Sequence, residues 1–231
     1  MKKIIRVIAI VLVVYCSFQL IGYGKDTVVT NVTKAEVKNK VFLPIRDRVD
    51  IRTTIKNADQ TKTDVLKEVK QEVKDSKPRI DFLYLKTLNS DVIAYIDYES
   101  LGISYPIVDS FDNEDYLHTD LYGNKSFAGT LFQDCNDTEK DWSFNHLIYG
   151  HNMKNCTMFG MLSHAKKGDT FYIYLPDKRM EYEVVQIKTI SPDDNFYTKG
   201  RLELNDTVSL STCKGENRLV VTGKKIKEVM I

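Results

Sequence analysis

The chain has 231 residues, with 33 Lys or Arg and 32 Asp or Glu, so its formal net charge is +1 at pH 7. This balance gives no bulk attraction for nucleic acid, and the lysines are scattered among acidic residues. Four cysteines are too few for a disulfide scaffold, and their spacing matches no zinc-binding pattern.

Residues 1–24 predict a cytoplasmic tip and a membrane anchor. Three basic residues among the first six precede an uncharged run from Val7 to Gly22. About twenty apolar residues in a helix cross a bilayer, and Ile4–Tyr23 is long enough if Arg6 reaches back to the headgroups. The basic residues predict a single-pass protein in the cell membrane, with a cytoplasmic N-terminus and the rest of the chain outside. The alternative is a cleaved signal peptide, although the run ends without a small-residue cleavage pattern.

Residues 25–79 predict a helical stalk between the anchor and the outer domain. The stretch is mostly polar and charged. Valines recur every four residues from Val65 to Val73 among Lys and Glu, which predicts a helix over Asp64–Asp75. Pro78 marks a break in the chain before the next domain.

Residues 80–231 predict one outer domain, because about 150 residues suffice for one core and not for two. Asp81–Leu88 predicts a helix, and Met158–Ala165 predicts a helical turn. Many short strands at this spacing indicate a barrel or a sandwich. The predicted strands cover Val92–Ile96, Ile103–Val108, Thr130–Gln133, His146–Tyr149, Thr170–Leu175, Arg179–Ile190, Val208–Thr212 and Arg218–Lys224.

Cys213 lies at the end of the predicted strand Val208–Thr212. Alternate side chains of a strand share a face, so Leu210 should point opposite to Cys213. If Leu210 fills the core, the thiol faces a surface groove, and a thiol beside Lys214 ionises more readily than a buried one. Most free cysteines are small apolar core residues, so the strand alone leaves both interpretations open.

His151 and Arg218 are the other candidates for chemistry. His151 follows a buried strand and is the one histidine of the four at a strand's far end, where functional sites collect. Only four residues separate Cys213 from Arg218, which predicts a hairpin that brings them close. A thiol, an imidazole and a guanidinium are the groups that covalent acyl transfer needs. A structural histidine and a solvated arginine remain the alternatives, and spacing does not bring His151 near the other two.

The remaining cysteines leave their pairing open. Cys16 lies in the predicted span, so Cys135, Cys156 and Cys213 would lie outside, and an odd number leaves at least one thiol unpaired. A Cys135–Cys156 disulfide is one option, whose geometry sequence does not test.

Several motifs of the outer domain occur together in a consistent order. Ser209–Cys213 reads S-L-S-T-C and is followed by Arg218, which resembles the T-L-x-T-C signature and later Arg of sortases. Leu147–Met153 with Met158-Phe159 resembles the I-Y-G-H-N-M…M-F stretch of class B sortases in particular. Further matches in order lie at residues 103–108, 112–117 and 129–132. The resemblance to class B sortases covers roughly residues 82–223.

The resemblance implies a mainly β fold, a closed eight-stranded sortase-type β-barrel with flanking short helices, behind the predicted stalk and transmembrane helix. It also implies a cysteine transpeptidase that needs no metal or organic cofactor. The thiolate of Cys213 would attack the Thr carbonyl of a C-terminal sorting signal on a secreted protein, with an N-P-x-T-x motif as the expectation. His151 would protonate the leaving amine and later serve as a base. An amine of the peptidoglycan precursor lipid II would then resolve the thioester.

Further site residues follow from the same resemblance. Arg218 would stabilise the oxyanion together with the backbone N–H of Lys214. The implied substrate-binding residues are Leu210, Ser211, Thr212, Lys214 and Asn152. Class B sortases usually carry a long helix before the cysteine strand, and Ser191–Asp206 is too short for that helix plus its loops.

Two rival classes differ in specific residues. L,D-transpeptidases place the cysteine in an S-H-G-C-x-R stretch, whereas no histidine stands beside Cys213. Papain-like enzymes place the cysteine at a helix start and before the histidine, whereas His151 precedes Cys213 here. A non-catalytic, membrane-tethered binding module is the third alternative, and removal of the thiol would distinguish it.

Overall fold

The computed structural model describes residues 17, 24, 27–28, 30–43, 78–137 and 142–231. The predicted span Ile4–Tyr23, apart from Ser17, lies outside these residues, as does the helix predicted over Asp64–Asp75. Within the described part of the chain, no helix is both long enough and apolar enough to cross a bilayer.

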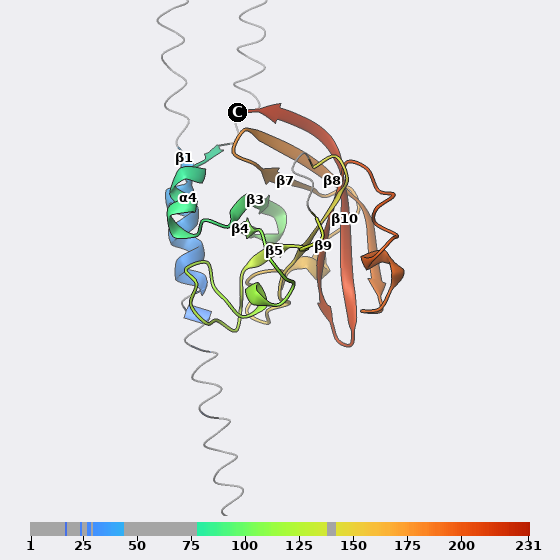
Figure 1. Cartoon of the computed structure of the whole chain (residues 1–231), viewed down its shortest axis with the longest axis horizontal. Helices are drawn as coiled ribbons and strands as arrows, with labels where there is room; N and C mark the ends of the chain where they lie inside the picture. The colour runs from blue at the N-terminus through green and yellow to red at the C-terminus, as the bar shows by residue number, and fades with distance from the viewer. Residues whose placement is uncertain (1–16, 18–23, 25–26, 29, 44–77, 138–141) are drawn as a thin grey trace, which may run out of the picture.

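Eight strands form a closed barrel in the order β10-β8-β7-β3-β4-β5-β6-β9, which confirms the predicted mainly β fold (Figure 1). The pairs β4–β5 and β6–β9 are parallel, and the other neighbours are antiparallel. The barrel strands are β3 (Val92–Tyr98), β4 (Ile103–Val108), β5 (Leu131–Gln133), β6 (Asn145–Tyr149), β7 (Thr170–Tyr174), β8 (Lys178–Ile190), β9 (Thr207–Lys214) and β10 (Asn217–Met230).

Short helices flank the barrel. The helix α4 (Phe82–Leu88) begins after Asp81, whose carboxylate accepts a hydrogen bond from the Tyr84 N–H at 2.9 Å. Single 3-10 turns follow the strands, and the turn predicted over residues 158–165 contains one of them. These turns are η3 (Glu99–Leu101), η4 (Asp115–Leu117), η5 (Leu162–His164) and η6 (Asn195–Tyr197).

A helix over residues 30–41 packs on the outside of the barrel beside α4 (Figure 1). Its Val37 and Val41 are buried in one apolar cluster with Leu85 and Tyr95. The chain continues into β1 (Phe42–Leu43), which pairs with β2 (Arg79–Ile80). Part of the segment predicted as a stalk is therefore bound to the domain by apolar burial.

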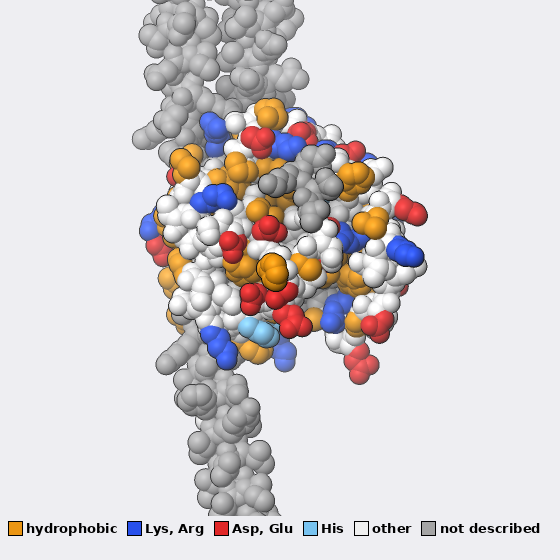
Figure 2. All heavy atoms as spheres, in the orientation of Figure 1, with side chains coloured by type: hydrophobic (Ala, Val, Ile, Leu, Met, Phe, Trp, Pro, Cys, Tyr) orange, Lys and Arg blue, Asp and Glu red, His pale blue; other side chains and the backbone are white. Residues whose placement is uncertain are grey.

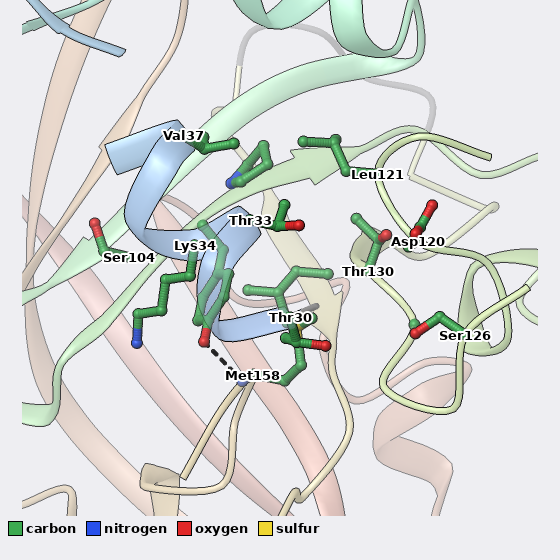
Figure 3. Close-up of a pocket in the computed structure, with 14 residues that line it drawn as sticks. Thr30, Thr33, Lys34, Val37, Ser104, Asp120, Leu121, Ser126, Thr130 and Met158 are labelled. Atoms are coloured by element: carbon green, nitrogen blue, oxygen red, sulfur yellow. Dashed lines mark hydrogen bonds between the residues drawn. The ribbon is translucent and has the colours of Figure 1, made fainter. Parts of the chain in front are cut away.

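A small cavity of about 40 Å³ lies between this helix and the barrel. Figure 3 shows Thr30, Thr33 and Val37 of the helix facing Leu121 and Thr130 across it. On the face shown in Figure 2, basic and acidic side chains are interspersed over the described residues, and neither sign covers the whole face.

Residues 191–206 cover the outer face of β6, β9 and β10. Phe196 packs there against Leu147 and Val220. Arg201 is 2% exposed and forms a buried ion pair with Asp137 and a longer one, at 3.5 Å, with Asp134. A buried cation between two carboxylates fixes this segment to the β5–β6 connection.

Replacing Arg201 with alanine should destabilise the fold strongly, because Asp134 and Asp137 would remain buried without their cation. The expected loss in the free energy of unfolding is about 3–5 kcal/mol. The exposed pair Lys224–Asp206, at 3.9 Å, provides a control, and Lys224→Ala should cost less than about 1 kcal/mol. Urea unfolding followed by circular dichroism measures both. Equal losses in the two variants would contradict the buried pairing.

Candidate active site

The parallel pairing of β6 with β9 brings the histidine to the cysteine. Tyr149, the last residue of β6, lies opposite Ser211 of β9. In a parallel pair the register advances by one residue on both strands at once. His151, two residues after Tyr149, is therefore level with Cys213, two residues after Ser211. Neighbouring strands are about 4.8 Å apart, which puts the two residues side by side.

Three hydrogen bonds continue this pairing past the end of β6. The N–H of Gly150 donates to the carbonyl of Ser211 at 3.2 Å. The hydroxyl of Thr212 donates to the carbonyl of Gly150 at 2.7 Å. The side-chain amide of Asn152 donates to the carbonyl of Cys213 at 2.8 Å. The Gly150 backbone and the Asn152 side chain, on the two sides of His151, thus both bind the cysteine strand.

Gly150 is required where the two strands join. A Cβ at this position would lie 2.3 Å from Leu131 Cδ2 and 2.7 Å from Phe159 Cδ2, both of them buried core side chains. Because glycine has no Cβ, the main chain can pass close to these core side chains just before His151.

Arg218 lies on the β10 side of Cys213, whereas His151 lies on the β6 side. Arg218 of β10 lies directly opposite Cys213 of β9, and directly opposite residues of an antiparallel pair share a face. The predicted hairpin is confirmed, with a two-residue turn that begins at Gly215, where φ is +61°. The strands β6, β9 and β10 are consecutive in the barrel. His151 just after β6, Cys213 in β9 and Arg218 in β10 therefore form a row at this end of the barrel.

This row lies on the outer face of the barrel, at its rim. Leu210 is wholly buried in the barrel core, so Cys213, three positions on in the same strand, points outward. The outward neighbour Ser211 is covered by residues 191–206, whereas Cys213 lies beyond that cover and is exposed. His151 and Arg218 are half-buried. The thiol is therefore open to solvent between a cation and an imidazole.

The orientation of the His151 ring follows from one hydrogen bond. Its Nε2 lies 2.9 Å from the carbonyl oxygen of Leu117, and a carbonyl can only accept, so Nε2 carries a hydrogen. The neutral ring therefore has its lone pair on Nδ1. The ring of Phe127 stacks on the imidazole at 6.4 Å, and the ring of His118 lies 6.2 Å away. Burial lowers the pKa of His151, and the positive form of His118 lowers it further, whereas the Leu117 carbonyl acts in the opposite direction.

His151 should titrate below the ordinary histidine pKa of 6.5. Burial disfavours the charged ring, so the ring is neutral at pH 7 and gains a proton only as the pH falls below that value. NMR of the imidazole carbon-bound protons against pH measures this midpoint. In the Phe127→Ala variant, the midpoint should move upward as water reaches the ring. A midpoint at or above 6.5 in the unmodified chain would contradict the buried, neutral imidazole.

Comparison with known proteins agrees with this geometry. Residues 96–226, more than half of the chain, match the sortase domain. The chain belongs to the sortase family. It is 34% identical over 114 residues to sortase B of Listeria monocytogenes, a match that covers 49% of this chain and 43% of that protein. It is 27% identical over 134 residues to sortase B of Staphylococcus aureus, covering 58% and 49%. This sortase therefore spans about half the length of the curated relatives it matches.

Solved structures agree with the class B resemblance. Clostridium perfringens sortase B superposes with a TM-score of 0.55 at 27% identity, covering 64% of this sortase and all of that chain. A sortase B–substrate complex from Staphylococcus aureus gives a TM-score of 0.55 at 22% identity, covering 63% and 84%, and supports the fold alone. The prediction of a class B sortase is confirmed.

Tyr197 is a site residue that sequence reasoning missed. Its hydroxyl lies 2.9 Å from the Ser211 hydroxyl, and its ring stacks on Tyr149 at 6.3 Å. Burial raises its pKa, the Arg218 charge lowers it, and the Cys213 thiolate raises it. The Tyr197 phenol is therefore near the Arg218 guanidinium and the Cys213 thiol. Tyr197 is one of 13 tyrosines in a segment without strand periodicity, so no sequence signal marked it.

The predicted substrate-binding side chains divide into two groups. The role of Leu210, Ser211 and Thr212 in substrate binding stays a prediction, and their side chains are at most 3% exposed. The reason is that both faces of β9 are covered, one by the core and the other by residues 191–206. Lys214 and Asn152 are exposed, and the Lys214 ammonium donates to the Thr189 hydroxyl at 3.2 Å.

The cysteines of the described residues are free thiols. Cys135 and Cys156 are not joined, so the optional disulfide between them is absent from this part of the chain. No cluster of metal-ligating side chains occurs among the described residues.

Proposed function

We propose that this sortase is a membrane-anchored cysteine transpeptidase. It cleaves a C-terminal sorting signal after Thr and transfers the protein, through a thioester on Cys213, to an amine of the cell-wall precursor. The observation that carries the proposal is the row formed at one rim of the barrel by His151 just after β6, Cys213 in β9 and Arg218 in β10. The family match and the two sortase B relatives support it.

In the acylation step, the thiol proton of Cys213 moves to Nδ1 of His151, which gives a thiolate and an imidazolium. The sulfur attacks the Thr carbonyl carbon, and the carbonyl oxygen gains the negative charge beside Arg218. The C–N bond then breaks, and the imidazolium returns its proton to the leaving amine. The Leu117 carbonyl accepts the Nε2 hydrogen in both states, so the ring keeps one orientation through the step.

In the transfer step, the incoming amine attacks the thioester carbon and His151 takes its proton. The bond from carbon to sulfur breaks, an amide forms, and the free cysteine is regenerated. We assign the acceptor to lipid II and the signal to an N-P-x-T-x motif from the class B resemblance.

The proposed location is the outer face of the cell membrane. The uncharged run from Val7 to Gly22 behind three basic residues supports a single N-terminal span, and the polar residues after it support a stalk. The substrates, secreted proteins and a membrane-bound precursor, would then meet the rim that carries Cys213.

A peptide-cleavage screen tests the proposed function. The full chain is incubated with a library of N-P-x-T-x and related peptides, and the products are separated by chromatography and identified by mass. Cleavage after Thr, with hydroxamate formed in the presence of hydroxylamine, is the expected result. Consumption of muropeptides without cleavage of any sorting peptide would favour a different cell-wall enzyme.

A further inference from the structure

Residues 151–160 form a loop after β6, the histidine loop, whose two ends lie side by side. The Phe159 N–H donates to the His151 carbonyl at 3.0 Å, and Asn152 bridges to Met158 as an antiparallel pair. The position of the His151 main chain therefore depends on where residues 158 and 159 are held.

The histidine loop has a backbone conformation that its own residues disfavour. The φ angles of Cys156 and Met158 are +64° and +50°, in the left-handed region that residues with a Cβ rarely adopt. Met158 is only 7% exposed, so its N–H is shielded from water and needs a partner within the protein. A contact from outside the loop is required to hold this conformation.

Tyr105 of β4 supplies that contact. Its hydroxyl oxygen accepts the Met158 N–H at 3.1 Å, the bond drawn as a dashed line in Figure 3. Burial raises the pKa of this phenol to about 12, so the hydroxyl stays neutral at physiological pH. The Tyr105 ring lies in the barrel core cluster together with Met158 and Phe159. A rigid strand thus holds the returning end of the histidine loop.

The helix over residues 30–41 supports the same arrangement from outside the barrel. The Lys34 ammonium lies 4.8 Å from the centroid of the Tyr105 ring and donates to the Gly102 carbonyl at 2.6 Å. Just before this helix, the Thr27 hydroxyl accepts the side-chain amide of Asn155 at 3.1 Å. The N-terminal segment therefore contacts the histidine loop directly, and also through Tyr105.

We propose that Tyr105 is a positioning residue that holds the histidine loop through Met158 and so keeps His151 level with Cys213, with Lys34 supporting the Tyr105 ring. The effect on turnover rests on the proposed transpeptidase function. Tyr105 lies in the barrel core and acts through the loop, so its hydroxyl should affect the chemical step and leave peptide binding unchanged.

Removing only the hydroxyl tests this role by steady-state cleavage of a sorting peptide. In Tyr105→Phe, kcat should fall about tenfold with KM little changed. Tyr98 is the matched control, because it belongs to the same core cluster and its hydroxyl donates to Asp169 at 2.8 Å. Tyr98→Phe should keep both constants. Equal kcat values in the two variants, or a change in KM alone, would overturn the positioning role.

The titration of His151 in the free full-length chain provides a readout that needs no substrate. Burial is the main cause of its lowered pKa, so a loosened loop that admits water should move the NMR midpoint upward in Tyr105→Phe. The midpoint should stay in place in Tyr98→Phe. An unchanged midpoint in Tyr105→Phe would overturn the inference even if kcat fell. The proposed function fails separately, if the unmodified chain cleaves no sorting peptide.

A lysine pair on one helix tests the support from outside the barrel. Lys34→Met should lower kcat about threefold and move the His151 midpoint in the same direction as Tyr105→Phe. Lys40 is the control, because its ammonium lies 5.8 Å from the ring of Tyr84, on the α4 side of the helix. Lys40→Met should change neither quantity. Identical results for the two lysine variants would exclude Lys34 from the positioning of His151.

Discussion

Replacing Cys213 with alanine should abolish acyl-enzyme formation and reduce kcat on the order of 10⁶-fold. The thiol is exposed between an imidazole and a guanidinium, and no described side chain beside it in the row is nucleophilic. Intact-mass analysis of the full chain after incubation with a sorting peptide measures the adduct. The unmodified chain should gain the mass of the cleaved peptide and lose it again with hydroxylamine.

Two other free thiols provide matched controls for this result. Cys156 is exposed and Cys135 is half-buried, and neither lies in the catalytic row. Cys135→Ala and Cys156→Ala should therefore keep acylation. An adduct that survives in Cys213→Ala would exclude the proposed nucleophile. Retention of all peptide binding without any adduct in the unmodified chain would instead favour a non-catalytic binding module.

Replacing Arg218 with lysine should reduce kcat by about 10²–10³-fold. Arg218 lies opposite Cys213, where a planar guanidinium can direct two N–H groups at an oxyanion. Lysine keeps the charge but offers a single point donor on a flexible stem. Because the oxyanion exists only during reaction, KM should change little.

Steady-state cleavage of a sorting peptide measures both constants. Arg79→Lys, at an exposed arginine of β2, is the control and should leave both unchanged. Near-normal turnover of Arg218→Lys would remove the guanidinium from the mechanism. A rise in KM alone would assign Arg218 to substrate binding.

The strands of this sortase could be predicted because most are short runs rich in apolar, β-branched or aromatic residues between turn signals. The end of β10 could not: Lys224–Lys227 is mostly charged, yet pairing with β8 carries the strand on to Met230. The barrel closure depends on the parallel pair β6–β9, whose members lie some sixty residues apart. Sequence spacing alone carries no information on such a pairing.

The candidate site was predictable to different degrees for local and distant contacts. The four-residue connection was enough to join Cys213 to Arg218. His151 was chosen for its strand end, but its position beside Cys213 depends on the β6–β9 register. The burial of Leu210, Ser211 and Thr212 could not be predicted, because it depends on how the barrel core and residues 191–206 pack on the two faces of β9.

The family match also decides between the rival classes. A sortase domain over residues 96–226 excludes an L,D-transpeptidase or a papain-like enzyme as the fold of this chain. The predicted anchor, the stalk helix and the lipid II acceptor remain predictions.

The most direct measurement is a crystal structure of the full chain bound to a sorting-signal peptide whose scissile bond is replaced by a thiol-reactive group. We expect the peptide carbon to be bonded to the Cys213 sulfur, with its oxygen about 3 Å from the Arg218 guanidinium. The His151 ring should lie on the side where the leaving amine would depart. Attachment at another cysteine, or an imidazole on the far wall of the barrel from that carbon, would contradict the convergence of these three residues on one bond.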